Sequence, residues 1–144
     1  GHQLIFEITE SLFLTEKDYV YAALNRLRAL GIELSIDDFG TGYSSLSRLK
    51  KMPVNEIKID QSFIFDMASN PDDKIIVKSI IDLAHNLGLT VVAEGVESEI
   101  ILQQLKQLGC DVVQGYLFSK PLPLAEFSNY LRQPMNSQQQ NSIP

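Results

Sequence analysis

The chain repeats one unit, in which a short apolar run ends in a charged or amide residue, a turn follows, and an amphipathic helix closes with glycine. The apolar runs are short and mostly rich in β-branched residues, which favours strands over helix segments. These runs cover residues 4–6, 34–36, 57–59, 91–93 and 112–114. Strands that alternate with helices predict an α/β fold with a parallel sheet covered by helices.

The helices are predicted from apolar residues spaced three and four positions apart. We expect helices around residues 15–30, 46–52, 72–87, 101–108 and 126–131. The strand segments read as continuous apolar runs, which is typical of a parallel sheet that is buried on both faces. Two architectures fit this pattern: an open doubly wound sheet, or part of a (β/α)₈ barrel.

Charged and amide side chains end the predicted strands, where both architectures place their functional sites. They are Glu7, Asp37, Asp38, Lys58, Asp60, Glu94 and Gln114. Parallel strands end on one side of a sheet, so the carboxylates among these residues should face one another. The alternative is a network of helix caps and salt bridges in an α/β domain without catalytic function.

Carboxylates gathered so closely repel one another unless positive charge lies among them. Lys58 supplies one charge, which is too few for four acidic strand ends. Oxygen ligands of this kind favour a hard divalent cation, Mg²⁺ or Mn²⁺. Asp37 could bridge two such ions while Asp38 reaches the second, and Lys58 could orient a water. The residues themselves therefore favour metal-assisted phosphodiester hydrolysis.

Composition excludes several other classes of function. The net charge of −6 argues against a DNA-binding surface. No apolar run approaches the roughly 20 residues that span a bilayer, so we expect no membrane contact by this segment. Cys110 is the only cysteine, which excludes an internal disulfide and indicates a reducing, cytoplasmic compartment. With no cysteine–histidine cluster a zinc site is not expected, and we interpret His85 as structural.

Five ordered motifs resemble those of the EAL-domain family of cyclic-di-GMP phosphodiesterases. They are E-x-T-E-S at residues 7–11, D-D-F-G-T-G-Y-S-S-L at 37–46, K-I-D at 58–60, A-E-G-V-E at 93–97, and Q-G-Y at 114–116 with Pro121 after it. The resemblance covers nearly the whole chain. It implies the C-terminal part of a TIM-like EAL barrel that hydrolyses cyclic di-GMP to linear pGpG at a two-metal site with Mg²⁺ or Mn²⁺.

The resemblance also implies roles for individual residues. Glu7, Asp37 and Asp38 correspond to metal ligands. Lys58 corresponds to a catalytic residue that contacts the phosphate or the water at the metal. Glu94 corresponds to the general base, or to a carboxylate that positions that water.

Further roles follow from the same motifs. Glu97 and Gln114 would complete the catalytic shell, and Glu10 would anchor the loop at residues 38–45. The implied substrate-binding positions are Asp60, Gly115, Tyr116 and Pro121.

The sequence departs from the family pattern at its start. The family's earlier strands supply the glutamate of the E-A-L motif, an arginine and an asparagine, and none of these is present. We therefore expect residues 1–133 to form a partial EAL domain that is inactive alone, followed by a polar, disordered tail at 134–144. A part-barrel exposes strand edges, which predicts a homodimer or other self-association.

Two other functions remain open at this point. The parent domain could bind cyclic di-GMP as a sensor without turnover. More remotely, Asp37 and Asp38 resemble the acidic pair of a phospho-receiver domain, which has an open doubly wound sheet, although no phospho-acceptor aspartate stands at the expected distance.

Overall fold

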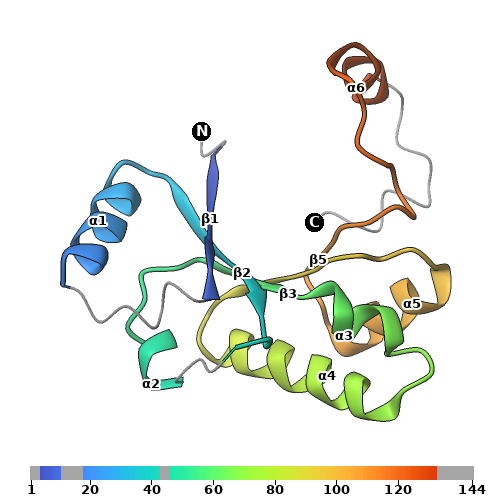
Figure 1. The fold of residues 1–144 in the computed structure, drawn as a ribbon, viewed down its shortest axis with the longest axis horizontal. Helices are drawn as coiled ribbons and strands as arrows, with labels where there is room; N and C mark the ends of the chain where they lie inside the picture. The colour runs from blue at the N-terminus through green and yellow to red at the C-terminus, as the bar shows by residue number, and fades with distance from the viewer. Residues whose placement is uncertain (1–3, 11–17, 43–45, 133–144) are drawn as a thin grey trace.

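The computed structural model describes residues 4–10, 18–42 and 46–132. Within these residues, five parallel strands form one sheet in the order β1-β2-β3-β4-β5, with helices between them (Figure 1). The strands are β1 (Ile5–Thr9), β2 (Glu33–Phe39), β3 (Glu56–Ile59), β4 (Thr90–Ala93) and β5 (Val112–Val113). The helices are α1 (Asp18–Ala29), α2 (Leu46–Leu49), α3 (Gln61–Asp66), α4 (Pro71–Asn86), α5 (Glu99–Leu108) and α6 (Leu124–Tyr130).

The strand order distinguishes the two predicted architectures. A doubly wound sheet reverses its order at a switch point, whereas a (β/α)₈ barrel adds each new strand beside the previous one. Every strand here pairs in parallel with the next strand in the sequence. The predicted barrel-type α/β fold is therefore confirmed, and the receiver-domain alternative is wrong.

The two faces of the sheet differ in chemistry. Burial on both faces, which the strand segments predict, is confirmed for β3 and β4, but the buried face that carries Lys58 is polar. In register across the sheet, Glu7 of β1 lies beside Ser35 of β2, Ser35 beside Glu56 of β3, and Glu56 beside Thr90 of β4. Residues in register share a face, and successive side chains in a strand alternate between faces. Lys58, two positions after Glu56, thus joins a polar face that corresponds to the interior of a barrel.

The opposite face is apolar and carries the helices. Its strand residues are fully buried: Leu34, Ile36, Ile57, Ile59, Val91 and Ala93. Helix α4 packs over β3 and β4 and buries Val77, Ile81 and Ala84. This one-sided core fixes the register of each strand, because a shift of one residue would exchange the two faces.

The helix predictions are confirmed in outline, with one omission. Helix α4 begins after Asn70, whose side chain accepts a hydrogen bond from the Asp72 amide at 3.0 Å. Helix α3 was not predicted, although Asp60 caps it by accepting a 2.8 Å bond from the Ser62 amide. The predicted start of the first helix near Thr15 and the polar tail at 134–144 lie outside the described residues.

None of the helices in the described part of the chain is both long and apolar enough to cross a membrane. The longest, α4, has 16 residues and carries acidic side chains in its first turn.

Candidate functional site

Three carboxylates converge at the carboxyl ends of the central strands. Asp37 and Asp38 come from the end of β2, and Glu94 follows β4 directly. One oxygen from each lies within 4.8 Å of the others. The predicted gathering of acids is therefore observed for these three residues.

A bulge in β2 explains how two adjacent acids reach the same site. Neighbouring residues in a regular strand point to opposite faces. The β2–β3 register shifts between Ile36 and Phe39, and Asp38 takes a φ of 55°. A positive φ is uncommon for a residue with a side chain, and bulges often re-aim side chains beside functional sites. The bulge turns Asp38 back toward Asp37 rather than away from it.

Lys58 lies at the centre of the acidic group. Its ammonium is 2.7 Å from Glu7 Oε1, 2.7 Å from Glu94 Oε1 and 3.0 Å from Asp37 Oδ1. Its side chain is only 7% exposed. Burial alone would lower the pKa of Lys58, but its bonds to Glu7, Glu94 and Asp37 outweigh that effect and raise the pKa. The lysine is therefore charged at neutral pH.

The remaining carboxylates still carry excess negative charge. Although Asp38 is exposed, some loss of hydration and the nearby Asp37, Asp60 and Glu94 raise its pKa. The pKa of Asp60 is lowered instead, because hydrogen bonds from Ser62 outweigh the effect of its burial. The negative charge of Asp38 is therefore disfavoured by its surroundings.

The geometry fits a hard divalent cation. Such ions take carboxylate oxygens as ligands, and three of these oxygens converge here. Asp37 Oδ1 is buried and lies 3.0 Å from the Lys58 ammonium. Carboxylate oxygens brought together from the ends of two strands are the donor set that such a cation prefers.

Glu10 holds the loop that follows β2. Its buried carboxylate accepts hydrogen bonds from the amides of Gly40 at 3.1 Å and Gly42 at 3.0 Å. A side chain on Gly42 would place its Cβ 2.9 Å from the Glu10 carboxylate. The contact that the anchor role requires is present, while residues 43–45 of the loop lie outside the described part.

A cavity of about 250 Å³ adjoins the acidic group. It is lined by Glu94, Glu97, Gln114, Gly115 and Tyr116, all predicted site residues, and by Gln61 and Gly95. Sequence reasoning missed Gln61. The available signal was its position directly after Asp60, at the end of a strand.

Gly115 has a structural reason for being glycine. A Cβ there would lie 2.1 Å from the Val96 carbonyl oxygen and 2.3 Å from the Val96 nitrogen. Backbone atoms at that distance cannot move aside, since Val96 itself bonds to the Gln114 carbonyl at 3.0 Å. This close approach joins the segments after β4 and β5 and sets one wall of the cavity.

Pro121 lies in an adjoining cavity of about 480 Å³. This cavity shares Gln114, Gly115 and Tyr116 with the smaller one and reaches to α6. The ammonium of Lys120 lies 5.5 Å from the centre of the Tyr116 ring, within the range of a cation–π contact.

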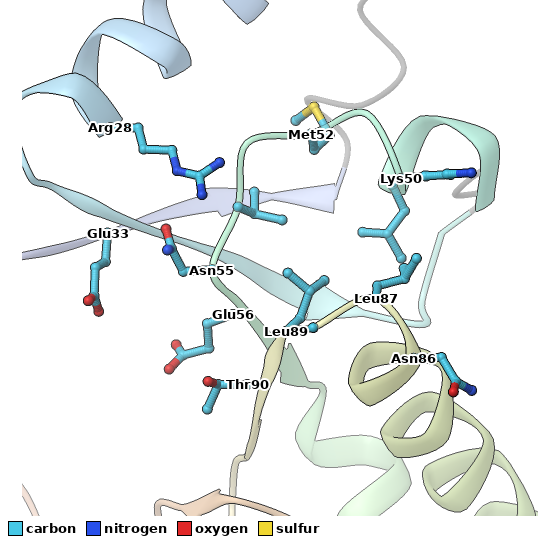
Figure 2. Close-up of a pocket in the computed structure, with 13 residues that line it drawn as sticks. Arg28, Glu33, Lys50, Met52, Asn55, Glu56, Asn86, Leu87, Leu89 and Thr90 are labelled. Atoms are coloured by element: carbon cyan, nitrogen blue, oxygen red, sulfur yellow. The ribbon is translucent and has the colours of Figure 1, made fainter.

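A larger cavity, of about 630 Å³, lies at the other end of the sheet (Figure 2). Glu33, Glu56 and Thr90, which line it, are the first residues of β2, β3 and β4. Ligands of parallel α/β folds bind at the carboxyl ends of strands. Size alone would therefore identify the wrong site.

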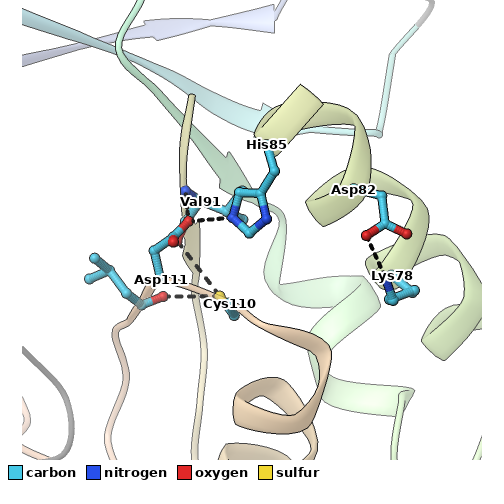
Figure 3. Close-up of polar contacts among 7 residues, drawn as sticks. Lys78, Asp82, His85, Val91, Cys110 and Asp111 are labelled. Atoms are coloured by element: carbon cyan, nitrogen blue, oxygen red, sulfur yellow. Dashed lines mark hydrogen bonds and ion pairs between the residues drawn. The ribbon is translucent and has the colours of Figure 1, made fainter. Parts of the chain in front are cut away.

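His85 and Cys110 also lie away from the acids, near the amino ends of β4 and β5 (Figure 3). His85 Nε2 is 2.9 Å from Asp111 Oδ2, which also accepts a 2.8 Å bond from the Val91 amide. Burial raises the pKa of the Cys110 thiol to about 12, so this thiol is not a reactive thiolate. His85 thus links α4 to the segment before β5, as its predicted structural role requires.

Known proteins have sequences and folds similar to those of this chain. The family model of the EAL domain matches residues 1–121. The chain is 49% identical over 129 residues to cyclic di-GMP phosphodiesterase NbdA of Pseudomonas aeruginosa, which covers 90% of the chain and 16% of that protein. The chain thus spans about one sixth of this curated relative's length.

Two solved structures are also similar to this chain in sequence and fold. The PaMucR phosphodiesterase in complex with c-di-GMP is 46% identical, with a TM-score of 0.82 over 86% of this chain and 50% of that one. Klebsiella pneumoniae BlrP1 with manganese and cyclic di-GMP is 39% identical, with a TM-score of 0.76 over 83% of this chain and 30% of that one.

Proposed function

Because the chain belongs to the EAL domain family, we propose that its parent domain hydrolyses cyclic di-GMP to linear pGpG with Mg²⁺ or Mn²⁺. The observation that carries this proposal is the convergence of Asp37, Asp38 and Glu94 around a charged lysine. In support, NbdA is named a cyclic di-GMP phosphodiesterase, and BlrP1 was solved with manganese and the cyclic dinucleotide.

Asp37, Asp38 and Glu94 would hold the cation, with Glu7 as a further ligand from β1. A bound divalent cation would lower the pKa of a water and stabilise the charge that develops on the phosphate. In a two-metal arrangement Asp37 and Asp38, which are adjacent at the end of β2, would supply ligands to both ions.

The chain's own residues would carry the proton and the charge. Glu94 is the proposed acceptor of the proton from the attacking water, and Lys58 keeps its carboxylate oriented through their 2.7 Å contact. Water would add to phosphorus, the bond to the ribose 3′ oxygen would break, and that oxygen would take up a proton from solvent. The products are a 3′ hydroxyl and a phosphate on the 5′ side, as in pGpG. Lys58 then offsets negative charge on that phosphate.

The cavity beside the acids would receive the nucleotide. Glu97 and Gln114 line it together with Gly115 and Tyr116, and Pro121 extends the same wall. The proposed substrate role of Asp60 is less direct, because its carboxylate is engaged with Ser62 and lies near Asp38. We propose instead that Asp60 caps α3 and helps to position Asp38.

Cyclic di-GMP should bind this chain only in the presence of a divalent cation. The acids that adjoin the cavity repel the phosphates of the ligand until a cation offsets their charge. Titration calorimetry with Mg²⁺, and then with chelator, measures the difference. We expect no pGpG by chromatography, because the E-A-L glutamate, the arginine and the asparagine of the family are absent from this sequence.

Three outcomes would change this proposal. Cation-independent binding would favour the sensor function without turnover. No binding under any condition would contradict the assignment of the ligand to this site. Appearance of pGpG with Mg²⁺ would show that the chain alone is active.

Self-association and a cytoplasmic location are further parts of the proposal. The edge strands carry exposed apolar residues, Ile5 and Phe6 on β1 and Val112 on β5, and unpaired strand edges favour pairing between chains. We expect sedimentation velocity at micromolar concentration to show a dimer or larger species, and a single monomeric species would contradict it. The cytoplasmic location rests on the free Cys110.

A further inference from the structure

We propose that Gln61 is a substrate-contacting residue that donates a hydrogen bond from its side-chain amide to one nucleotide half of the ligand. This inference rests on the proposed function and adds a residue to its site. Gln61 lines the cavity that Glu94, Glu97 and Gln114 also line, and no predicted role accounts for it.

The position of Gln61 is set by the start of α3. Asp60 caps that helix through the Ser62 amide, which fixes Gln61 as the first helical residue after β3. Glu94 follows β4, and Gln114 follows β5. Because these strands are neighbours in the sheet, Gln61 and Gln114 flank Glu94 from its two sides.

Gly95 makes room for the Gln61 side chain. A Cβ on Gly95 would lie 2.7 Å from Gln61 Cβ and 3.5 Å from its Oε1. Gln61 is exposed, and one side of its side chain lies against Gly95. Gly95 also has a φ of +70°, so both the backbone and this contact favour glycine at that position.

The chemistry of the cavity calls for neutral donors. Glu94 and Glu97 give this wall negative charge, whereas the proposed ligand carries phosphates. An amide donates a hydrogen bond to a phosphate oxygen without adding charge, and its own oxygen can accept from a base or ribose hydroxyl. Gln61 and Gln114 supply such amides on both sides of Glu94.

The size of the cavity limits what Gln61 can contact. Pockets that enclose a drug-sized ligand measure about 300–1,000 Å³, and this one measures about 250 Å³. It would hold one nucleotide of a cyclic dinucleotide, with the other half outside. Gln61 is therefore expected to affect binding of the whole ligand through contacts with only one half.

The test uses the full chain and titration calorimetry of cyclic di-GMP in Mg²⁺. Gln61→Ala removes the donor and is expected to weaken binding about fivefold, the value of one hydrogen bond. Gln61→Glu keeps the shape but adds a third carboxylate, and is expected to weaken binding by more than about tenfold. Gln103→Ala on α5, where the glutamine donates to the exposed Glu99, serves as the matched control.

Two further measurements distinguish contact between Gln61 and the ligand from support of the cation site or the fold by Gln61. The Mg²⁺ affinity and the melting temperature of Gln61→Ala should match those of the unmodified chain. Binding within twofold for both Gln61 variants would overturn the inference while leaving the proposed function intact. A loss of Mg²⁺ affinity would also overturn it, because Gln61 would then support the cation site. If the unmodified chain fails to bind the ligand, the proposed function and this inference fall together.

Discussion

Replacing Asp38 with asparagine is expected to weaken Mg²⁺ or Mn²⁺ binding on the order of 100-fold and yet to stabilise the metal-free protein. The first effect follows from the loss of one charged ligand among the three that converge, since cation affinity depends on ligand charge. A 100-fold change corresponds to about 2.7 kcal/mol of binding free energy.

The metal-free protein is expected to become more stable because the negative charge of Asp38 is unfavourable without a cation. Although Asp38 is exposed, some loss of hydration and the neighbours Asp37, Asp60 and Glu94 raise its pKa, so folding disfavours its charged form. Asparagine removes this repulsion and can donate a hydrogen bond to Asp60. It also tolerates the positive φ of 55° at this position.

Calorimetric titration with Mn²⁺ and urea denaturation in chelator measure the two effects on Asp38→Asn. Asp82→Asn on the exposed face of α4 is the matched control, and it should alter neither the cation affinity nor, by more than about 0.5 kcal/mol, the stability. An unchanged Mn²⁺ affinity in Asp38→Asn would contradict the proposed ligand set.

Replacing Lys58 with methionine is expected to lower the free energy of unfolding of the metal-free protein by about 3 kcal/mol. The change leaves Glu7, Asp37 and Glu94 together without their shared counter-charge. The figure is at the lower end for a broken buried ion pair because Glu7 is 50% exposed and stays partly solvated.

The Lys58→Met substitution, which destabilises the metal-free protein, is expected to strengthen cation binding. Lys58 holds three of the carboxylates proposed as ligands, Glu7, Asp37 and Glu94, so its removal frees them and removes a repelling charge. Mg²⁺ is therefore expected to bind Lys58→Met more tightly and to restore part of its lost stability, since a ligand of the native state stabilises by mass action.

Urea denaturation with chelator and with millimolar Mg²⁺ tests both effects. Lys78→Met is the matched control, because the Lys78–Asp82 pair is exposed and such pairs contribute about 0.5 kcal/mol or less. Weaker Mg²⁺ binding in Lys58→Met would instead mean that the lysine organises the ligands.

The stabilisation that the Lys58 ion pairs provide is expected to persist to high pH. The folded-state pKa of Lys58 is raised, so their contribution is fully present below the ordinary lysine pKa of about 10.4 and is lost only as pH rises through the raised value. The stability difference between the unmodified chain and Lys58→Met should therefore be constant from neutral pH to about pH 9.

The alternating units determined the parallel α/β fold, because a short β-branched run followed by an amphipathic helix has few other ways to bury its apolar side chains. The same local signals identified α4 and the acidic strand ends. Helix α3 was missed because six residues carry too little periodicity to be distinguished from a loop.

The amino-acid sequence by itself determined which residues end the strands, and hence that acids would gather at one edge of a parallel sheet. Only the tertiary structure decided how they meet. The bulge that turns Asp38 beside Asp37, the three contacts of Lys58 and the fit of Gln61 against Gly95 depend on residues far apart in sequence. Local patterns specify an element and its faces, whereas register, strand order and side-chain contacts between elements are fixed only when the whole sheet packs.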